Sequence, residues 1–299
     1  MHSHTTPAIS LAQNTQQSQR LIAAQARLYS DVKRDSALRL AVIAAVAVSL
    51  SWVSINNDST TAVGTVGGLA ALVLQALVTW RERRKVSLAS AIQEQFDTEV
   101  YQLPWNSVVV RHRPNGQDIA RAAARYKGDR TRDWYPDTGR VVRPLDILIC
   151  QQSNVGWGIP VHRIWSWTLA GAAIAGVLVL GLVWKAASLS PSGGLDAIVV
   201  PFLSVMWEVF EHVRTNLASA RAKDEIQQLM LDDWNTATTG GQLPTVERCR
   251  LFQDQIVGIR RTNAHVPDWF DRALRTKNER AMRTTSHDMV AAAKRAGLT

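Results

Sequence analysis

Four apolar stretches of membrane-spanning length divide the chain. They cover residues 38–55, 61–80, 164–184 and 195–210, and polar sequence flanks each pair. The first stretch would form a helix roughly 27 Å long at about 1.5 Å per residue, close to the thickness of a hydrocarbon core. Long apolar runs with few charges predict transmembrane helices. We therefore expect an all-α membrane protein with four transmembrane helices.

Short connections join these stretches in pairs. Residues 56–60 separate the first two, and residues 185–194, which contain Pro191 and two glycines, separate the last two. Connections of this length and composition favour tight turns. The pattern therefore predicts two transmembrane hairpins, 38–80 and 164–210.

The fourth stretch, 195–210, fits a membrane span least well. It is the shortest, and it contains Asp196, Pro201 and Glu208. By length alone it also fits a buried helix of a soluble core. Its assignment depends on the distribution of charge along the rest of the chain.

Basic residues favour four spans and predict their orientation. Of the 34 lysines and arginines, all but Lys185 lie outside the two hairpins or at their edges. Only an even number of spans places these basic segments on one side of the membrane. Because lysine and arginine accumulate in cytoplasmic segments, both termini and the central segment 81–163 are predicted to be cytoplasmic. The net charge of +9 and mean hydropathy of -0.08 hide this division by averaging over it.

The polar segments are expected to build one helical cytoplasmic domain. Residues 1–37 carry an apolar stripe at helical spacing, and similar stripes follow the second and fourth spans. These two membrane helices are therefore expected to continue into the cytoplasm. In the central segment 81–163, the part from Leu103 to Trp157 is rich in proline and glycine, which predicts short helices joined by loops.

The C-terminal segment, 211–299, completes this domain. Its pattern predicts a helix near Thr245 to Arg261, a break at Pro267 and a last helix from about Trp269 to Arg295.

The sequence contains none of the common catalytic motifs. It lacks a GxSxG elbow, an HExxH helix, a GxxxxGK[ST] phosphate loop and a GxGxxG turn after a strand. Its seven histidines are scattered, and Cys150 and Cys249 lie in segments predicted to face the reducing cytoplasm. We therefore expect no enzyme activity, no cofactor and no metal site.

Six short strings in the polar segments resemble a known bacterial family. They are AAQARLYSDVK (23–33), FDTEVYQLPWN (96–106), RYKGDRTRDWYP (125–136), ICQQSNVGW (149–157), FQDQIVGIR (252–260) and VPDWF (266–270). Together, in this order and with the spans between them, they resemble the SMODS-associated four-transmembrane effector family over nearly the whole chain. The chain departs from the family pattern at Gly158, which stands in place of an acidic residue.

This resemblance implies a role in cyclic-oligonucleotide-based anti-phage defence (CBASS). In such systems a nucleotidyltransferase senses infection and makes a cyclic nucleotide, which triggers a membrane effector. The resemblance implies a non-enzymatic effector of the bacterial inner membrane that permeabilises the bilayer and causes abortive infection. Its implied partners are a cyclic oligonucleotide, the lipid bilayer and, functionally, the nucleotidyltransferase, with no DNA or RNA partner.

The central segment offers candidate residues for binding such a ligand. A cyclic oligonucleotide presents phosphates and flat bases, so its receptor needs cationic donors beside stacking surfaces. The candidate nucleotide-binding residues are Trp105, Asn106, Arg111, Arg113, Arg140 and Arg143. Two other interpretations stay open: the basic residues contact anionic lipid headgroups, and Trp105 anchors a small core.

Small residues in the spans are candidates for helix packing. Gly64 and Gly68 form a GxxxG pair on the second span, and Gly171 and Ala175 form a similar pair on the third. Such pairs allow close approach of two helices, either within one subunit or between subunits. Since four helices alone enclose no wide lumen, a pore would require a homo-oligomer.

Two carboxylates on the fourth span are candidate pore-lining residues. Asp196 and Glu208 are costly against lipid, and intramembrane charges usually face water or a protein interior. The alternative places Asp196 at the outer membrane interface and Glu208 at the inner one.

Two other functions stay open at this point. A membrane-anchored sensor or scaffold would recruit a partner through the cytoplasmic domain, and would bind its ligand without leakage. A membrane-bound enzyme would need a catalytic group assembled from residues far apart in the sequence.

Overall fold

The computed structural model describes residues 7–56 and 61–299, without the side chains of residues 61–72 and 74. The described chain is mostly helical and contains no strand. Three of its helices are long and apolar enough to cross a membrane. The prediction of an all-α membrane protein is therefore confirmed.

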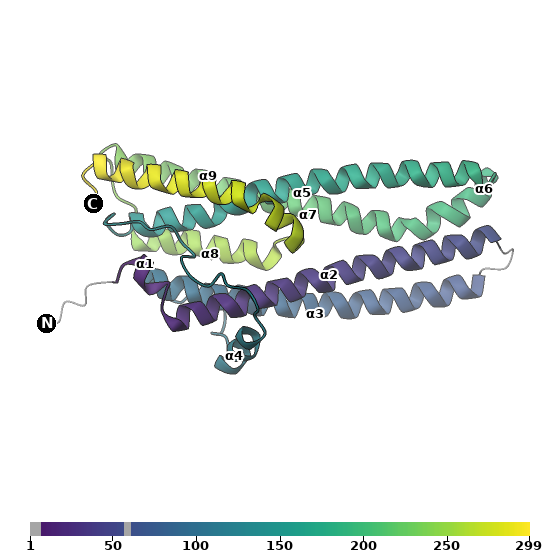
Figure 1. Cartoon of the computed structure of the whole chain (residues 1–299), viewed down its shortest axis with the longest axis horizontal. Coiled ribbons are helices and arrows are strands. Elements are labelled where there is room, and N and C mark those ends of the chain that lie inside the picture. Colours follow the sequence, from purple (N-terminus) through teal and green to yellow (C-terminus); the bar gives the residue numbers. More distant parts are fainter. Residues whose placement is uncertain (1–6, 57–60) are drawn as a thin grey trace.

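Four long helices form two antiparallel hairpins that lie side by side (Figure 1). The first pairs α2 (Gln16–Asn56) with α3 (Thr61–Tyr101), and the second pairs α5 (Leu145–Ala186) with α7 (Val200–Thr238). All four extend well beyond their apolar stretches. The sequence predicted such continuation for the second and fourth spans, and the structure adds the first and third.

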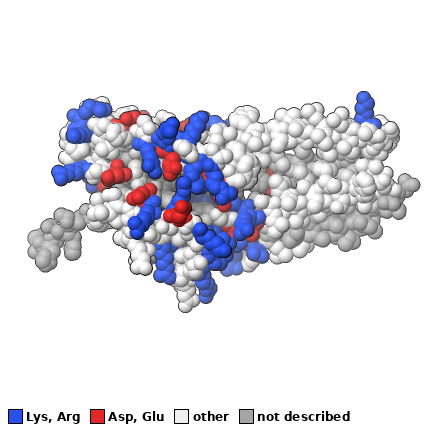
Figure 2. Space-filling model, viewed as in Figure 1, with Lys and Arg blue, Asp and Glu red and all other residues white. Residues whose placement is uncertain are grey.

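Charge divides the molecule along these helices (Figure 2). Lysine, arginine and acidic residues cover one half, here named the polar domain, which consists of residues 7–37, 81–163 and 211–299. The other half, here named the apolar half, consists of residues 38–56, 61–80 and 164–210. The end of α2 at Asn56, the start of α3 at Thr61 and the turn between α5 and α7 all lie at the far end of the apolar half (Figure 1).

The shorter helices lie in the polar domain, except for two at the far end of the second hairpin. The polar domain contains α1 (Ile9–Ala12), α4 (Gly116–Ala124), α8 (Val246–Thr262) and α9 (Asp268–Arg295). At the far end, α6 (Pro191–Gly194) and the π-helix η1 (Leu195–Val199) run into α7.

Local sequence signals explain where several of these helices begin. Asn115 caps α4 by accepting a hydrogen bond from the backbone N–H of Gln117, and Thr245 caps α8 through the N–H of Arg248. The predicted helices near Thr245 to Arg261 and from Trp269 to Arg295 are present as α8 and α9. The last turn of α8 is basic, which complements the helix dipole.

The central segment departs from its prediction. Instead of several short helices between Leu103 and Trp157, the described chain has α4 and then the first three turns of α5, which starts at Leu145. The polar residues of this stretch stay helical because neighbouring helices satisfy their side chains. For example, the amide of Gln151 donates to the carbonyl oxygen of Cys249 and to the side chain of Gln253.

Two large apolar clusters and two small ones fill the polar domain. One large cluster joins α1, α2, α3, α4 and α5 around Phe96, Tyr101 and Tyr135, and the other joins α5, α7, α8 and α9 around Phe252, Met230 and Trp234. α5 contributes to both large clusters and therefore holds the two sides of the domain together.

Candidate functional site

A cavity of about 240 Å³ lies inside the polar domain. Its wall includes side chains from α2, α3, α5, α7, α8 and α9, together with the connection between α8 and α9. The lining residues are Tyr29, Lys33, Gln93, Asn154, Val155, Trp157, Gly158, Val161, His162, Lys223, Ile256, Ile259, Arg260, Asn263, Ala264, His265, Val266 and Asp271. All four long helices that enter the apolar half therefore contact this one space.

Four of the six strings noted in the sequence meet at the cavity. The first contributes Tyr29 and Lys33, the fourth Trp157, the fifth Arg260 and the sixth Val266. These strings lie far apart along the chain, and packing of the long helices brings them together. Half of the lining residues thus belong to the strings that carried the family resemblance.

Lys223 on α7 is the cation of the cavity without a counter-charge. It is half-buried, and within the described residues it forms no ion pair. Its amine lies over Gly158 on α5, so a Cβ atom at position 158 would clash with Nζ. The absence of a side chain at Gly158 therefore leaves room for this ammonium group.

The other charged side chains of the wall are paired with opposite charges. These pairs are Lys33 with Asp268, Arg260 with Asp97, and Asp271 with Arg275. The cavity consequently has one uncompensated positive charge, that of Lys223. Such an arrangement favours an anionic ligand.

Burial shifts the pKa values of several groups around the cavity. Burial and then repulsion from Arg260 lower the pKa of Lys223 to about 7. Burial lowers the pKa of His265 to about 4, so this imidazole is neutral at pH 7. Although burial acts in the opposite direction, the carboxylate of Asp97 holds the pKa of Arg260 above its ordinary value.

Three buried polar atoms beside the cavity lack a hydrogen-bond partner among the described residues. They are Nη2 of Arg260, the hydroxyl of Tyr29 and Oδ1 of Asn263. Buried polar groups are normally paired, so each such atom points to an absent partner. Two of the three are donors that suit an anion.

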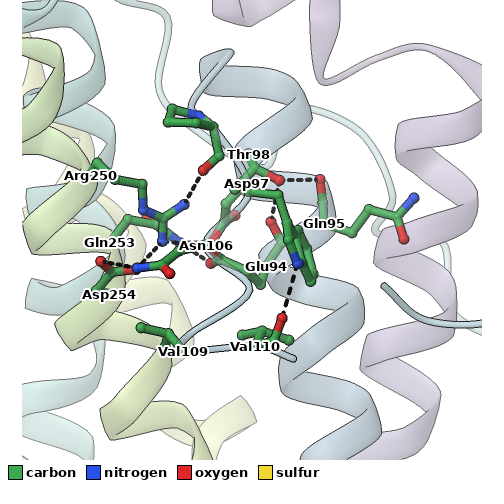
Figure 3. Close-up of polar contacts among 12 residues, drawn as sticks. Glu94, Gln95, Asp97, Thr98, Asn106, Val109, Val110, Arg250, Gln253 and Asp254 are labelled. Atoms are coloured by element: carbon green, nitrogen blue, oxygen red, sulfur yellow. Dashed lines mark hydrogen bonds and ion pairs between the residues drawn. The ribbon is translucent and has the colours of Figure 1, made fainter. Parts of the chain in front are cut away.

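A buried polar network fixes α8 against α3 next to the cavity (Figure 3). Arg250 donates to Glu94 at 2.6 Å and to Asp254 at 2.7 Å, while the amide of Gln253 donates to Glu94 at 2.8 Å and to Asp97 at 2.7 Å. Burial raises the pKa of Glu94 to about 7, against the opposing effect of Arg250. The network sets the position of the helix that carries Arg260.

A second ionic cluster joins the two hairpins where the polar domain meets the apolar half. Nη1 of Arg39 on α2 lies 2.6 Å from Glu208 on α7, and Nε lies 3.5 Å from Glu82 on α3. His212 on α7 lies 3.3 Å from the same oxygen of Glu208. We name these four residues the boundary cluster. It ties α7 of the second hairpin to both helices of the first.

Comparison with known proteins identifies the family of the chain. Residues 7–289 match the model of the SMODS-associating 4TM effector domain. The chain belongs to this family. A relative from Bacillus cereus (strain VD146), described as a probable CBASS effector molecule, is 21% identical over 285 residues, which are 90% of this chain and 94% of the relative. No solved structure matches the chain.

In this family member, the predicted nucleotide-binding residues lie outside the cavity wall. Asn106 donates to Asp254 at 2.9 Å, and Arg143 pairs with Asp146 at 2.9 Å. The indole N–H of Trp105 donates to the carbonyl oxygen of Val110 at 2.9 Å. These three side chains therefore have structural partners.

The other three predicted binding residues are accessible. Arg111, Arg113 and Arg140 are exposed, and the guanidinium of Arg113 lies 5.1 Å from the ring centroid of Trp105. Their role in ligand binding stays a prediction.

The structure also places the predicted membrane residues. Glu208 is buried in the boundary cluster, whereas Asp196 is exposed in the first turn of η1 at the far end. Gly171 and Ala175 are exposed, and a Cβ atom at Gly171 meets no described neighbour within 4 Å. Their exposure leaves this pair accessible for a contact between subunits, which stays a prediction.

The pair Gly64 and Gly68 lies in the first turns of α3, whose side chains are outside the described residues.

Sequence reasoning missed Lys223. Its stretch of α7 stood out only for apolar residues at helical spacing, and its own charge matched the basic surroundings. The sequence held one indirect signal, the glycine at position 158 directly after a family string. In the structure, this glycine leaves room for the amine of Lys223. Only the packing of α5 against α7 reveals this relation.

Proposed function

We propose that this protein is an anti-phage effector of the bacterial inner membrane. It senses a cyclic oligonucleotide through its polar domain and then oligomerises or opens to permeabilise the membrane, which causes abortive infection. The polar domain and both termini face the cytoplasm, where a cyclic-oligonucleotide-forming nucleotidyltransferase supplies the signal. The effector itself acts without catalysis.

The observation that carries this proposal is the continuity of the four long helices. α2, α3, α5 and α7 each run without interruption from the apolar half into the polar domain. A ligand that changes the packing of the polar domain therefore moves the membrane helices as well. The family and the Bacillus cereus relative support the defence role.

The resting state is closed in this proposal. Glu208 is held by Arg39, so the charge available to a pore is neutralised at rest. The ligand must bind the open or assembled state more tightly than the resting one, because equal affinity shifts no equilibrium. Several subunits are needed, since the four helices of one chain enclose no lumen.

Dye release from liposomes tests the proposal. Purified protein is inserted into dye-filled liposomes and exposed to a panel of cyclic di- and trinucleotides. Release that depends on one nucleotide is the expected result. Binding of a nucleotide without release would contradict permeabilisation and favour a membrane-anchored sensor or scaffold that recruits a partner.

A further inference from the structure

We infer that the cavity beside Lys223 is a phosphate-binding site, and that it receives one phosphate and the adjoining base of the nucleotide signal. This inference rests on the proposed function for the identity of its ligand. The phosphate binds the ammonium group of Lys223, with Arg260 and Tyr29 as further donors. The base lies against Trp157, within reach of the cavity amides.

Charge is the first argument for this site. Among the residues that the structure describes, every other charged side chain of the wall pairs with an opposite charge, and only Lys223 has no counter-charge. A partly desolvated ammonium group without a counter-ion is costly, and a bound phosphate would reduce that cost. The cavity therefore favours a ligand that places a single negative charge beside Lys223, as a phosphodiester group does.

The unpaired donors are the second argument. Nη2 of Arg260 and the hydroxyl of Tyr29 are buried without partners among the described residues, and both residues line the cavity together with Lys223. A phosphate has several acceptor oxygens and could satisfy more than one donor at once.

The remaining lining suits a nucleobase. Trp157 offers an aromatic face, and base stacking on aromatic side chains is worth about 1–3 kcal/mol per base. Gln93, Asn154 and Asn263 supply amide donors and acceptors. No comparable set of aromatic and amide groups would be needed to bind inorganic phosphate alone.

The size of the cavity connects binding to a movement of the helices. At about 240 Å³ it is smaller than the roughly 300–1,000 Å³ typical of sites for larger organic ligands. A whole cyclic oligonucleotide therefore fits only if the surrounding helices separate. These helices include the four that continue into the apolar half, so a state with wider separation is the state that the ligand stabilises.

A phosphate can reach this site from solution or from a lipid headgroup. Lys223 lies 13 residues beyond the end of the fourth apolar stretch, a distance of roughly 20 Å along a helix. This separation from the membrane boundary favours a soluble phosphate ester. The experiment below compares both sources.

Protection of Lys223 from acetylation tests the site without relying on membrane damage. The protein is held in phosphatidylcholine nanodiscs, treated with acetic anhydride near pH 7 with and without each cyclic nucleotide, and analysed by mass spectrometry. We expect one nucleotide to slow acetylation of Lys223 by about tenfold while exposed Lys277 on α9 reacts unchanged. Nanodiscs with phosphatidylglycerol and no nucleotide form the lipid arm.

Substitution of Lys223 supplies the functional arm. Lys223→Met keeps most of the side-chain volume and removes the desolvated charge, so we expect it to fold normally. The nucleotide concentration for half-maximal dye release should rise by at least about tenfold. Lys277→Met, at an exposed lysine of α9, should leave this concentration unchanged.

Each outcome decides between the two proposals. If Lys223→Met releases dye at the wild-type nucleotide concentration, the site is overturned and the proposed function still stands. Loss of release in an Arg111→Ala, Arg113→Ala double variant would then place the binding site at these two arginines. Protection of Lys223 without any dye release supports the site and contradicts permeabilisation. Protection by phosphatidylglycerol alone, or no protection by any nucleotide, overturns a soluble nucleotide as its ligand.

Discussion

The helix α5 passes through two environments that hold it in different ways. From Leu145 to Ser166, buried residues occur on all of its faces, because α7, α8, α9 and the first hairpin surround it. Beyond Ser166 none of its residues up to Ala186 is buried. The same continuous helix is therefore a core element in the polar domain and a surface element in the apolar half.

The difference shows which forces support each half. In the polar domain, side-chain packing and buried ion pairs between distant helices position the backbone. In the apolar half, each helix satisfies its own backbone hydrogen bonds, and contact with lipid replaces contact with protein. Substitutions should consequently cost most in the polar domain, less at the boundary cluster and least on the exposed face of the apolar half.

The largest effect is expected for Asp97→Asn in the polar domain. Asp97 is fully buried and accepts from Tyr135, Gln253 and Arg260, so the amide would leave the guanidinium of Arg260 buried without a counter-charge. We expect a loss of about 3–5 kcal/mol in the free energy of unfolding. Thermal unfolding in detergent measures it.

Glu99→Gln is the matched control for this variant. Glu99 lies on the same helix, but its side chain is more exposed and its contact with Arg113 is 3.9 Å long. Loss of the Glu99 charge should change the free energy of unfolding by less than about 0.5 kcal/mol. Equal stability of the two variants would contradict the view that buried ion pairs hold the polar domain together.

The boundary cluster should give the next largest effect. Arg39→Ala removes the cation between Glu82 and Glu208 and leaves two carboxylates close together. We expect a loss of about 2–3 kcal/mol and a higher rate of dye release without nucleotide, because repulsion separates the hairpins. Arg34→Ala, at an exposed position on the same helix, is the control. An unchanged basal release rate would exclude this cluster as the contact that keeps the hairpins closed.

The cavity interrupts the packing of the polar domain, and the pH dependence of nucleotide binding tests its role. Because the pKa of Lys223 is lowered to about 7 in the free protein, a bound phosphate raises it and the complex takes up a proton. Nucleotide affinity is then highest below pH 7 and falls as pH rises, by up to about tenfold per pH unit. Binding measured from pH 6 to pH 9 gives this slope.

The control for the pH experiment is Lys223→Met, whose affinity should be nearly independent of pH. Other titratable groups also line the cavity that contains Lys223: Tyr29 and Lys33 from α2, His162 from α5, Arg260 from α8, His265 from the connection to α9, and Asp271 from α9. Burial keeps the two histidines neutral across this range. A slope that persists in Lys223→Met would assign the proton to another group.

The smallest effect is expected on the exposed face of α5. Gly171→Leu adds a side chain where a Cβ atom meets no described neighbour within 4 Å. The free energy of unfolding should change by less than about 0.5 kcal/mol. Crosslinking in liposomes then reports whether the larger side chain disturbs a contact between subunits. A clear loss of stability in the isolated subunit would show that this face packs within one chain.

The sequence predicted the arrangement of elements better than the location of the site. The four apolar stretches and the last two helices are local patterns, and each corresponds to a helix in the structure. The pairing of the stretches follows from the short connections between them. The start of α5 at Leu145 was missed, because its polar residues Gln151 and Gln152 are buried by partners on distant helices. Of the proposed binding residues, Asn106 and Arg143 turned out to have structural partners.

The amino-acid sequence by itself determined the membrane character of this protein and its family. Hydropathy, helix caps and short recognisable strings depend on residues close together in the chain, so they can be read without coordinates. Tertiary structure alone decided that Arg39 meets Glu208 and that Lys223 stands unpaired over Gly158. Burial and charge compensation depend on which helices pack together, and a one-dimensional pattern does not specify that.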